Sequence, residues 1–180
     1  DAQESRGLGD VYKRQSVDEV LEKNWPGLHI EPLQAPENME VLIGWTGSPA
    51  SSPHLVSEVK RLKSDPIFYG KFLDQSNTCV ENLIYAFKTN NIKGVQKMIR
   101  QNRSIIQQMD KEATVDIETK KLKLLCDIGE RFGGAAKTSG AGGGDCGITI
   151  IDNRVDKHSI YEVWEKKGIK PLKFKIYHGQ

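Results

Sequence analysis

A cluster of glycines constrains the fold of this sequence more than any other feature. Of the 17 glycines in the 180-residue chain, five fall within the eight positions 140–147. Glycine tolerates positive φ, so successive backbone N–H groups in such a segment can point into one concavity. A phosphate group fits that concavity, because no side chain keeps its oxygens away from the backbone. The cluster therefore predicts an anion-binding loop, with a flexible linker as the alternative.

The residues on either side of the cluster favour a binding loop over a linker. Thr138 and Ser139 offer hydroxyl donors just before the glycines, and Lys137 offers a charge that would neutralise an anion. Residues 147–151 (GITII) are apolar and β-rich, and they predict a strand directly after the loop. The segment differs from a P-loop, which ends in Lys-Ser/Thr, and no helix follows its glycines. We therefore predict an anion-binding loop that joins a helix to a strand.

Hydrophobic patterning along the rest of the chain indicates an α+β fold. Alternating or continuous apolar residues predict strands at residues 28–33, 39–45, 147–151 and 172–177. Helical periodicity predicts helices around residues 55–62, 80–87, 92–109, 122–132 and 160–164. Asp65-Pro66 is expected to end the first of these helices, and Gly133-Gly134 to cap the fourth. Because helices follow one another in the middle of the chain, α+β architecture is favoured.

The charge balance and the cysteine content exclude several classes of protein. The chain has 26 basic and 24 acidic residues, largely intermixed, for a net charge of +2. This balance gives no electrostatic argument for a nucleic-acid partner, and no apolar run is long enough to span a membrane. Cys79, Cys126 and Cys146 are far apart and odd in number, so they form neither a disulfide framework nor a metal-ligand pair. We therefore expect a cytoplasmic protein, whose oligomeric state the sequence does not fix.

The N-terminal residues 1–15 are expected to lie outside the protein's own fold. Residues 10–15 (DVYKRQ) resemble the in-frame translation of a transposon-end sequencing adapter, and residues 1–15 show no sustained apolar period. On this interpretation the protein's own sequence begins near Ser16, and the chain is a fragment of a longer protein. An ordinary helical or unstructured N-terminal segment is the alternative.

Several separated motifs resemble one enzyme family. Residues 137–148 (KTSGAGGGDCGI) resemble the third conserved motif of the GHMP kinases, a lysine followed by a glycine cluster between a helix and a strand. Within that superfamily this form is most similar to the bacterial phosphomevalonate kinases. Residues 24–33 (NWPGLHIEPL), 41–52 (VLIGWTGSPASS) and 176–180 (IYHGQ) agree with the same branch. The resemblance covers residues 16–180.

The resemblance implies both a fold and an activity. The fold would be a GHMP kinase C-terminal domain, an α+β structure in which an antiparallel, ferredoxin-like sheet packs with helices. Residues 53–180 would form this domain, and residues 16–52 would hold the end of an N-terminal domain region and linking strands. The activity would be ATP- and Mg²⁺-dependent phosphorylation of 5-phosphomevalonate to 5-diphosphomevalonate in the mevalonate (isoprenoid) pathway.

The resemblance also implies a set of substrate-binding residues and no metal ligand. Hydroxyl and backbone N–H groups at the start of the glycine cluster would hold the acceptor phosphate. Ser52 would bind the mevalonate end, and Lys137 would order the loop or offset phosphate charge. Asp145 would anchor the turn, and Cys146 is interpreted as a packing residue. The substrate-binding residues implied are Ser52, Lys137, Ser139, Gly140, Ala141 and Gly142.

The sequence also departs from the family pattern. The family's ATP loop, a Gly-Leu-Gly-Ser-Ser pattern, its catalytic aspartate and a phosphate-binding lysine come from an N-terminal domain, and none is found here. Gly7-Leu8-Gly9 is followed by Asp10 instead. We therefore expect no catalytic residue in this chain and no turnover by the chain alone. Another GHMP enzyme, such as a mevalonate kinase or a diphosphomevalonate decarboxylase, and a non-catalytic anion-binding module remain the alternatives.

Overall fold

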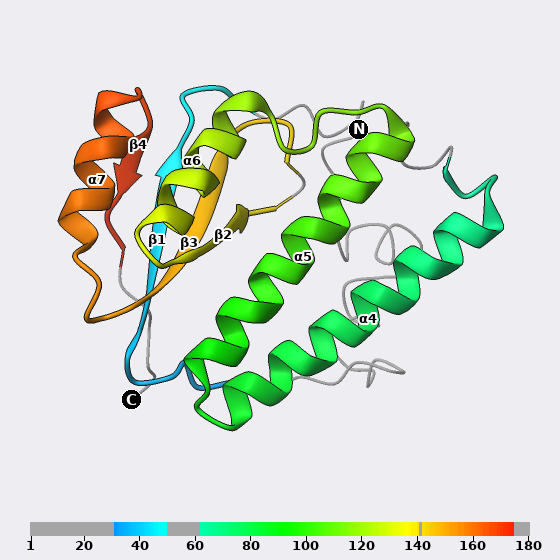
Figure 1. The fold of residues 1–180 in the computed structure, drawn as a ribbon, viewed down its shortest axis with the longest axis horizontal. Coiled ribbons are helices and arrows are strands. Elements are labelled where there is room, and N and C mark those ends of the chain that lie inside the picture. Colours follow the sequence, from blue (N-terminus) through cyan, green and yellow to red (C-terminus); the bar gives the residue numbers. More distant parts are fainter. Residues whose placement is uncertain (1–30, 50–61, 141, 175–180) are drawn as a thin grey trace, which may run out of the picture. The chain divides into compact units, whose positions relative to one another are not determined.

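The computed structural model describes residues 31–49, 62–140 and 142–174 of the chain. Apart from residues 31–32, these belong to one compact unit, Leu33–Gln180. Within the described part, three consecutive helices follow the first strand, and a β-hairpin, a helix and a strand come after them (Figure 1). The elements are β1 (Met39–Trp45), α4 (Pro66–Lys88), α5 (Ile92–Ala113), α6 (Lys120–Arg131), β2 (Ala135–Thr138), β3 (Cys146–Asp152), α7 (Lys157–Lys166) and β4 (Lys170–Leu172).

The strands of the described part form one antiparallel sheet in the order β2-β3-β1-β4. The central pair, β1 and β3, is in register along its whole length, with Met39 opposite Asp152 and Trp45 opposite Cys146. A strand, helices, a β-hairpin, a helix and a last strand give the split β-α-β pattern of ferredoxin-like folds. The structure thus confirms the predicted α+β class and the antiparallel, ferredoxin-like sheet.

Helices cover both faces of this sheet. Ala136 of β2 and Ile151 of β3 pack with Leu125 of α6 and with Trp164 of α7. The neighbouring strand residues pack with α4 and α5 instead. Because successive strand residues point to opposite faces, α6 and α7 cover one face, and α5 with its neighbour α4 covers the other. Trp164 is fully buried, and its indole Nε1 donates to the Leu125 carbonyl at 3.1 Å, which ties α7 to α6.

The close approach of α6 to the sheet depends on two glycines that face each other across β1 and β3. Gly44 and Gly147 are register partners, and the side chain of Leu125 lies over both. A Cβ on Gly44 would meet Leu125 Cδ1 at 2.8 Å, and one on Gly147 would meet Cδ2 at 2.7 Å. Leu125 therefore occupies the space that two larger residues would fill, which seats α6 on the sheet.

The residues Asp65-Pro66 lie between two helices. They were expected to end the helix predicted at 55–62, and Leu62 is helical and is followed by a turn at residues 63–64. Asp65 is also the N-cap of α4, and its carboxylate accepts the N–H groups of Ile67 (3.1 Å) and Phe68 (3.0 Å). Proline is compatible with a first helical position, because the N–H that it lacks would have no partner there. The predicted helix at residues 80–87 is therefore only the last part of a helix that begins at Pro66.

The strand predictions were partly wrong. β2 was missed, and the last strand of the described residues lies at Lys170–Leu172. Of the strand predicted at 172–177, residues 173–174 lie outside any strand and residues 175–177 are outside the described part. Residues 31–33 of the strand predicted at 28–33 lie outside any strand, and residues 28–30 are outside the described part. The predicted helix at 55–62 also lies almost wholly outside it. The sequence placed residues 39–45 in the linking segment 16–52. In the structure they form β1, an inner strand of the sheet, and belong to the compact unit Leu33–Gln180.

Candidate functional site

The glycine loop connects β2 to β3, so it closes a β-hairpin. The sequence had it joining a helix to a strand, which is wrong, because Lys137 and Thr138 already belong to β2. Thr138 pairs with Gly147 at the base of the loop, and the Ser139 N–H donates to the Cys146 carbonyl at 3.0 Å. β2 was missed because Ala135-Ala136-Lys137-Thr138 is short and has no apolar-polar alternation.

The loop backbone runs through consecutive residues with positive φ. The φ angles of Gly142, Gly143, Gly144 and Asp145 are 78°, 75°, 131° and 58°. Such angles are ordinary for glycine and cost a residue with a Cβ roughly 1–2 kcal/mol, least for Asp and Asn. The predicted positive-φ backbone is therefore present, and the glycine cluster is required by the conformation of the chain.

Backbone hydrogen bonds hold the loop on two sides. The Gly143 N–H donates to the carbonyl of Ile117, in the connection between α5 and α6, at 2.8 Å. The Asp145 N–H donates to the Ser48 carbonyl at 2.6 Å, and the Asp145 carbonyl accepts the Thr46 N–H at 2.8 Å. These contacts place the loop between the end of β1 and the α5–α6 connection. They agree with the expected anchoring role of Asp145, which acts through its backbone.

The remaining N–H groups of the loop are not used in this way. Among the described residues, the N–H groups of Gly140, Gly142 and Gly144 have no hydrogen-bond acceptor. Ser139 and Gly140 are exposed, and a Cβ on Gly140 would meet nothing within 4 Å. The loop thus has a fixed side, at Gly143 and Asp145, and an open side at Ser139 and Gly140, whereas Gly142 and Gly144 are buried. Fixed donors on an open surface are what an oxyanion needs.

Lys137 supplies a positive charge at the start of the loop. Its Nζ donates to the Thr138 carbonyl at 2.6 Å, which places the ammonium next to the first loop residue. Burial lowers the pKa of Lys137, and the nearby thiols of Cys126 and Cys79 act in the opposite direction. No carboxylate of the described residues lies within 4.0 Å of Lys137 Nζ. The charge therefore has no acidic partner in that part of the chain, so it is available to an anion.

Two of the expected binding residues, Ser52 and Ala141, lie outside the described residues. The structure brings Lys137, Ser139, Gly140 and Gly142 together on one hairpin. Gly142 has a packing role as well, because a Cβ there would clash with the Ile117 carbonyl oxygen.

The structure supports the packing interpretation of Cys146. The thiol is half-buried, and burial together with the adjacent Asp145 carboxylate raises its pKa. A raised pKa keeps a thiol protonated and unreactive near neutral pH.

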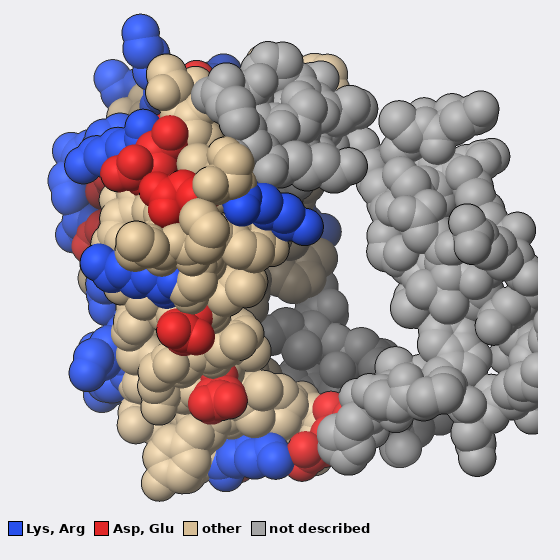
Figure 2. Space-filling view, turned by 90° about the vertical axis from the view of Figure 1, so that its right-hand side faces the viewer, with Lys and Arg blue, Asp and Glu red and all other residues tan. Residues whose placement is uncertain are grey.

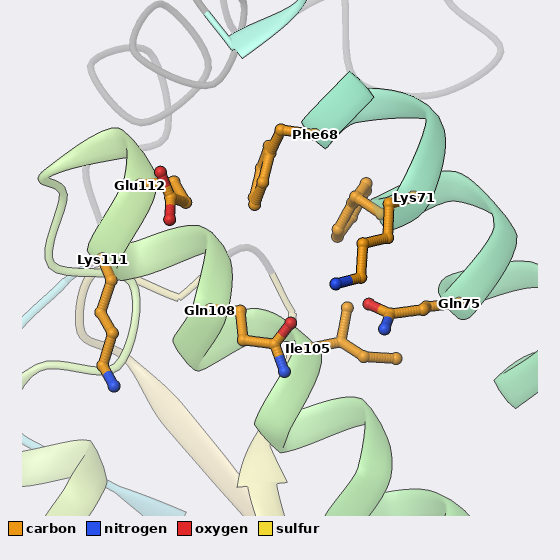
Figure 3. A pocket seen from close by; sticks show the side chains of 8 residues that line it. Phe68, Lys71, Gln75, Ile105, Gln108, Lys111 and Glu112 are labelled. Carbon is orange, nitrogen blue, oxygen red and sulfur yellow. The ribbon is translucent and has the colours of Figure 1, made fainter. Parts of the chain in front are cut away.

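A separate cavity lies between α4 and α5 and contains none of these residues. Its volume is about 180 Å³, with Phe68, Phe72 and Ile105 as its apolar lining. Figure 3 shows Lys71 and Gln75 directed into the space toward α5, whereas Lys111 points away from it. Its lining includes none of the described residues that the sequence predicted for a binding site. We therefore place the candidate site at the glycine loop.

One face of the described surface carries charges of both signs. On the face in Figure 2, Lys and Arg lie among Asp and Glu over uncharged surface. No helix of the described residues is both long enough and apolar enough to cross a membrane. Within the same residues, no group of three or more His, Cys, Asp or Glu side chains is placed to hold a metal ion.

Sequence reasoning missed the residues that fix the loop. Ile117 and Ser48 act through their backbone carbonyls, and Thr46 through its N–H. Backbone groups are common to all residues, so no side-chain pattern distinguishes these positions. The one indirect signal is the glycine at position 142, which implies that something lies against its backbone.

Comparison with known proteins places this loop in a family context. Residues 83–170 match the family described as "GHMP kinases C terminal". The chain is 36% identical over 166 residues to a phosphomevalonate kinase from Streptomyces sp. (strain CL190), a match that covers 91% of this chain and 44% of that protein.

Solved structures agree with this match. The Lin0012 protein from Listeria innocua superposes with a TM-score of 0.81 at 37% identity, over 94% of this chain and 48% of that one. The Streptococcus pneumoniae phosphomevalonate kinase in complex with phosphomevalonate and AMPPNP superposes with a TM-score of 0.74 at 26% identity, over 92% of this chain and 47% of that one. The chain thus spans about half the length of the relatives it matches.

Proposed function

We propose that this chain, whose residues 83–170 match the GHMP kinase C-terminal family, is the acceptor-binding part of a phosphomevalonate kinase. The whole enzyme would transfer the γ-phosphoryl group of ATP to 5-phosphomevalonate, giving 5-diphosphomevalonate and ADP. The observation that carries the proposal is the anchored glycine loop, in a chain that is similar to a phosphomevalonate kinase over 91% of its length.

The acceptor phosphate would bind at the start of the loop. Ser139 would donate its hydroxyl, and the N–H groups of Gly140, Ala141 and Gly142 would bind the oxygens. Lys137, which lacks an acidic partner among the described residues, would offset the charge. Phosphoryl transfer asks a protein mainly for positioning and charge stabilisation, so fixed backbone donors suit it.

Ser52 would contact the mevalonate end of the same substrate. Its position is limited by its distance in sequence from Ser48, whose carbonyl accepts the Asp145 N–H at 2.6 Å. Four residues of fully extended chain span at most about 14 Å. This spacing would allow one small acceptor to bridge the loop and Ser52.

ATP and Mg²⁺ would complete the site. The pneumococcal relative is described in complex with AMPPNP as well as with phosphomevalonate. The described residues offer no cluster of metal ligands, and Mg²⁺ commonly binds through substrate phosphates with one or two carboxylates. We propose that the ATP loop and those carboxylates come from the part of the relatives that this chain does not span.

The same proposal assigns domain boundaries to the chain and a cellular compartment to the enzyme. Residues 1–15 would be adapter-derived or unrelated, residues 16–52 would continue an N-terminal domain, and residues 53–180 would form the C-terminal domain. β1 lies in the second domain's sheet, so the linking segment would contribute its strand to that domain. The enzyme would act in the cytoplasm.

The proposal is tested on the complete gene product. Sequencing the genomic region upstream of Ser16 should reveal a continuous reading frame with a Gly-Leu-Gly-Ser-Ser loop. The expressed product should form ADP with phosphomevalonate in a coupled assay, and mevalonate should be a much poorer acceptor. Equal or reversed rates would refute the phosphomevalonate assignment and favour another GHMP kinase. A start codon directly before the Ser16 codon, together with no ADP formation, would favour a non-catalytic anion-binding module.

A further inference from the structure

The α5–α6 connection supports one side of the glycine loop, and its own support comes from α5. Ile117 accepts the Gly143 N–H at 2.8 Å and lies against Gly142 so closely that no Cβ fits between them. Any displacement of Ile117 would therefore be transmitted to the loop directly.

One carboxylate on α5 fixes Ile117 by its backbone. Asp110 Oδ1 accepts the Ile117 N–H at 2.7 Å, and Asp110 Oδ2 accepts the Glu118 N–H at 2.9 Å. A carboxylate that accepts two backbone N–H groups holds both peptide units in one orientation. Hydrogen bonds of this kind, with an ionised acceptor, are stronger than those between neutral groups.

The side chain of Glu118 anchors the same connection a second time. It is almost fully buried, with 4% of its side chain exposed, and it forms an ion pair with Arg103 of α5. Gln107 Nε2 donates to its second oxygen at 2.6 Å, and Arg103 also reaches Asp127 of α6 at 2.8 Å. The connection is thus held rigidly to α5, and through Asp127 to α6.

We propose that Asp110 is a positioning residue for the acceptor phosphate, acting through Ile117 and Gly143 on the donors of the glycine loop. The inference rests on the proposed function of that loop. Among the described residues Asp110 makes no hydrogen bond with a loop residue, and its effect passes through the two consecutive hydrogen bonds described above. Glu118, Arg103 and Gln107 hold the connection in place, whereas Asp110 sets the orientation of the Ile117 peptide.

The variant Asp110→Asn tests this relay, with Asp116→Asn as its matched control. Asn keeps the shape of the side chain but can accept only one of the two N–H groups, so the Ile117 peptide loses its fixed orientation. Asp116 is an exposed carboxylate on the same connection and accepts no hydrogen bond among the described residues. In the full chain, we expect the Gly143 amide of Asp110→Asn to exchange with solvent about tenfold faster. The Val95 amide, inside α5, should be unaffected.

The kinetic experiment on the complete gene product separates positioning from general stability. For Asp110→Asn we expect the KM for phosphomevalonate to rise about tenfold, with the KM for ATP unchanged. Asp116→Asn should behave as the wild type, and Asp110→Glu replaces Asp110→Asn if the latter does not fold. An unchanged KM for phosphomevalonate, or equal rises for both substrates, would overturn the inference. If the wild-type gene product had no phosphomevalonate-dependent activity, the proposed function would be overturned. The exchange rate of the Gly143 amide would then still show whether Asp110 holds the loop through Ile117.

Discussion

At the scale of single residues, the glycines of the loop have different roles. Gly140 is exposed and open, whereas Gly142 has a φ of 78° and lies against Ile117. Position 140 is therefore constrained only by what binds the loop, and position 142 by the fold. Substitutions at the two positions can therefore test binding and stability separately.

Replacing these two glycines by alanine should give opposite results. Gly142→Ala should lower the free energy of unfolding by about 1–3 kcal/mol, because it forces a strained φ and a contact with the Ile117 carbonyl. Gly140→Ala should change it by less than about 0.5 kcal/mol, while weakening the binding of phosphomevalonate by blocking the backbone. Urea unfolding and a binding titration measure the two effects. Equal stability losses would contradict the assignment of the packed and open sides.

Alkylation should distinguish the three cysteines. Burial raises the pKa of Cys126 to about 12 and also raises that of Cys79, and both side chains are buried. At pH 8 the thiolate fraction of a group with a pKa of 12 is only about 10⁻⁴. Cys146 is half-buried and at the end of the loop, so iodoacetamide should label it first, and more slowly than a free thiol. Mass spectrometry after timed labelling gives the order, and early labelling of Cys126 would contradict the described core.

At the scale of the elements, the sequence predicted those whose pattern is local. α5 and α6 have buried residues at regular helical spacing, and both were found close to their expected positions. α4 carries exposed apolar residues, among them Ile67 and Tyr85, so its hydrophobic pattern does not define one face. β2 has no alternating pattern, and its place is fixed by pairing with β3. The glycine cluster could be predicted, as α5 could, because its pattern lies in consecutive residues. The carbonyls of Ile117 and Ser48, which hold the loop, could not be predicted, because they become its neighbours only in the folded chain.

The packing of α6 on the sheet gives a prediction at this scale. Gly44→Ala should lower the free energy of unfolding by about 1–3 kcal/mol, because its Cβ would meet Leu125, Ile169 and Trp164. Gly70→Ala in α4 is the matched control, since a Cβ there would meet nothing within 4 Å. It should raise the free energy of unfolding by about 0.5–1 kcal/mol, through helix propensity. Urea denaturation of both variants measures the difference, and destabilisation of Gly70→Ala by the same amount would argue against specific packing at Gly44.

At the scale of the whole molecule, the described residues would, on the proposed function, provide one side of a phosphoryl-transfer site. They hold anchored donors for an anion and a lysine without an acidic partner, and they contain no cluster of metal-binding side chains. In phosphoryl transfer, charge develops on the oxygens of the transferred group, between the donor and the acceptor. A loop that holds only the acceptor therefore stabilises little of that charge.

Binding and turnover should accordingly be separable in the 180-residue chain. We expect it to bind phosphomevalonate weakly, in the millimolar range or about 4 kcal/mol, because only the contacts of the loop are made. We expect no detectable ADP formation, because the groups that stabilise the transferred phosphoryl would be missing. An NMR titration of the loop amides measures the first, and a coupled ADP assay the second, with the complete gene product as the positive control. Turnover by the 180-residue chain would mean that its own residues supply the donor site, and would contradict the division of labour proposed here.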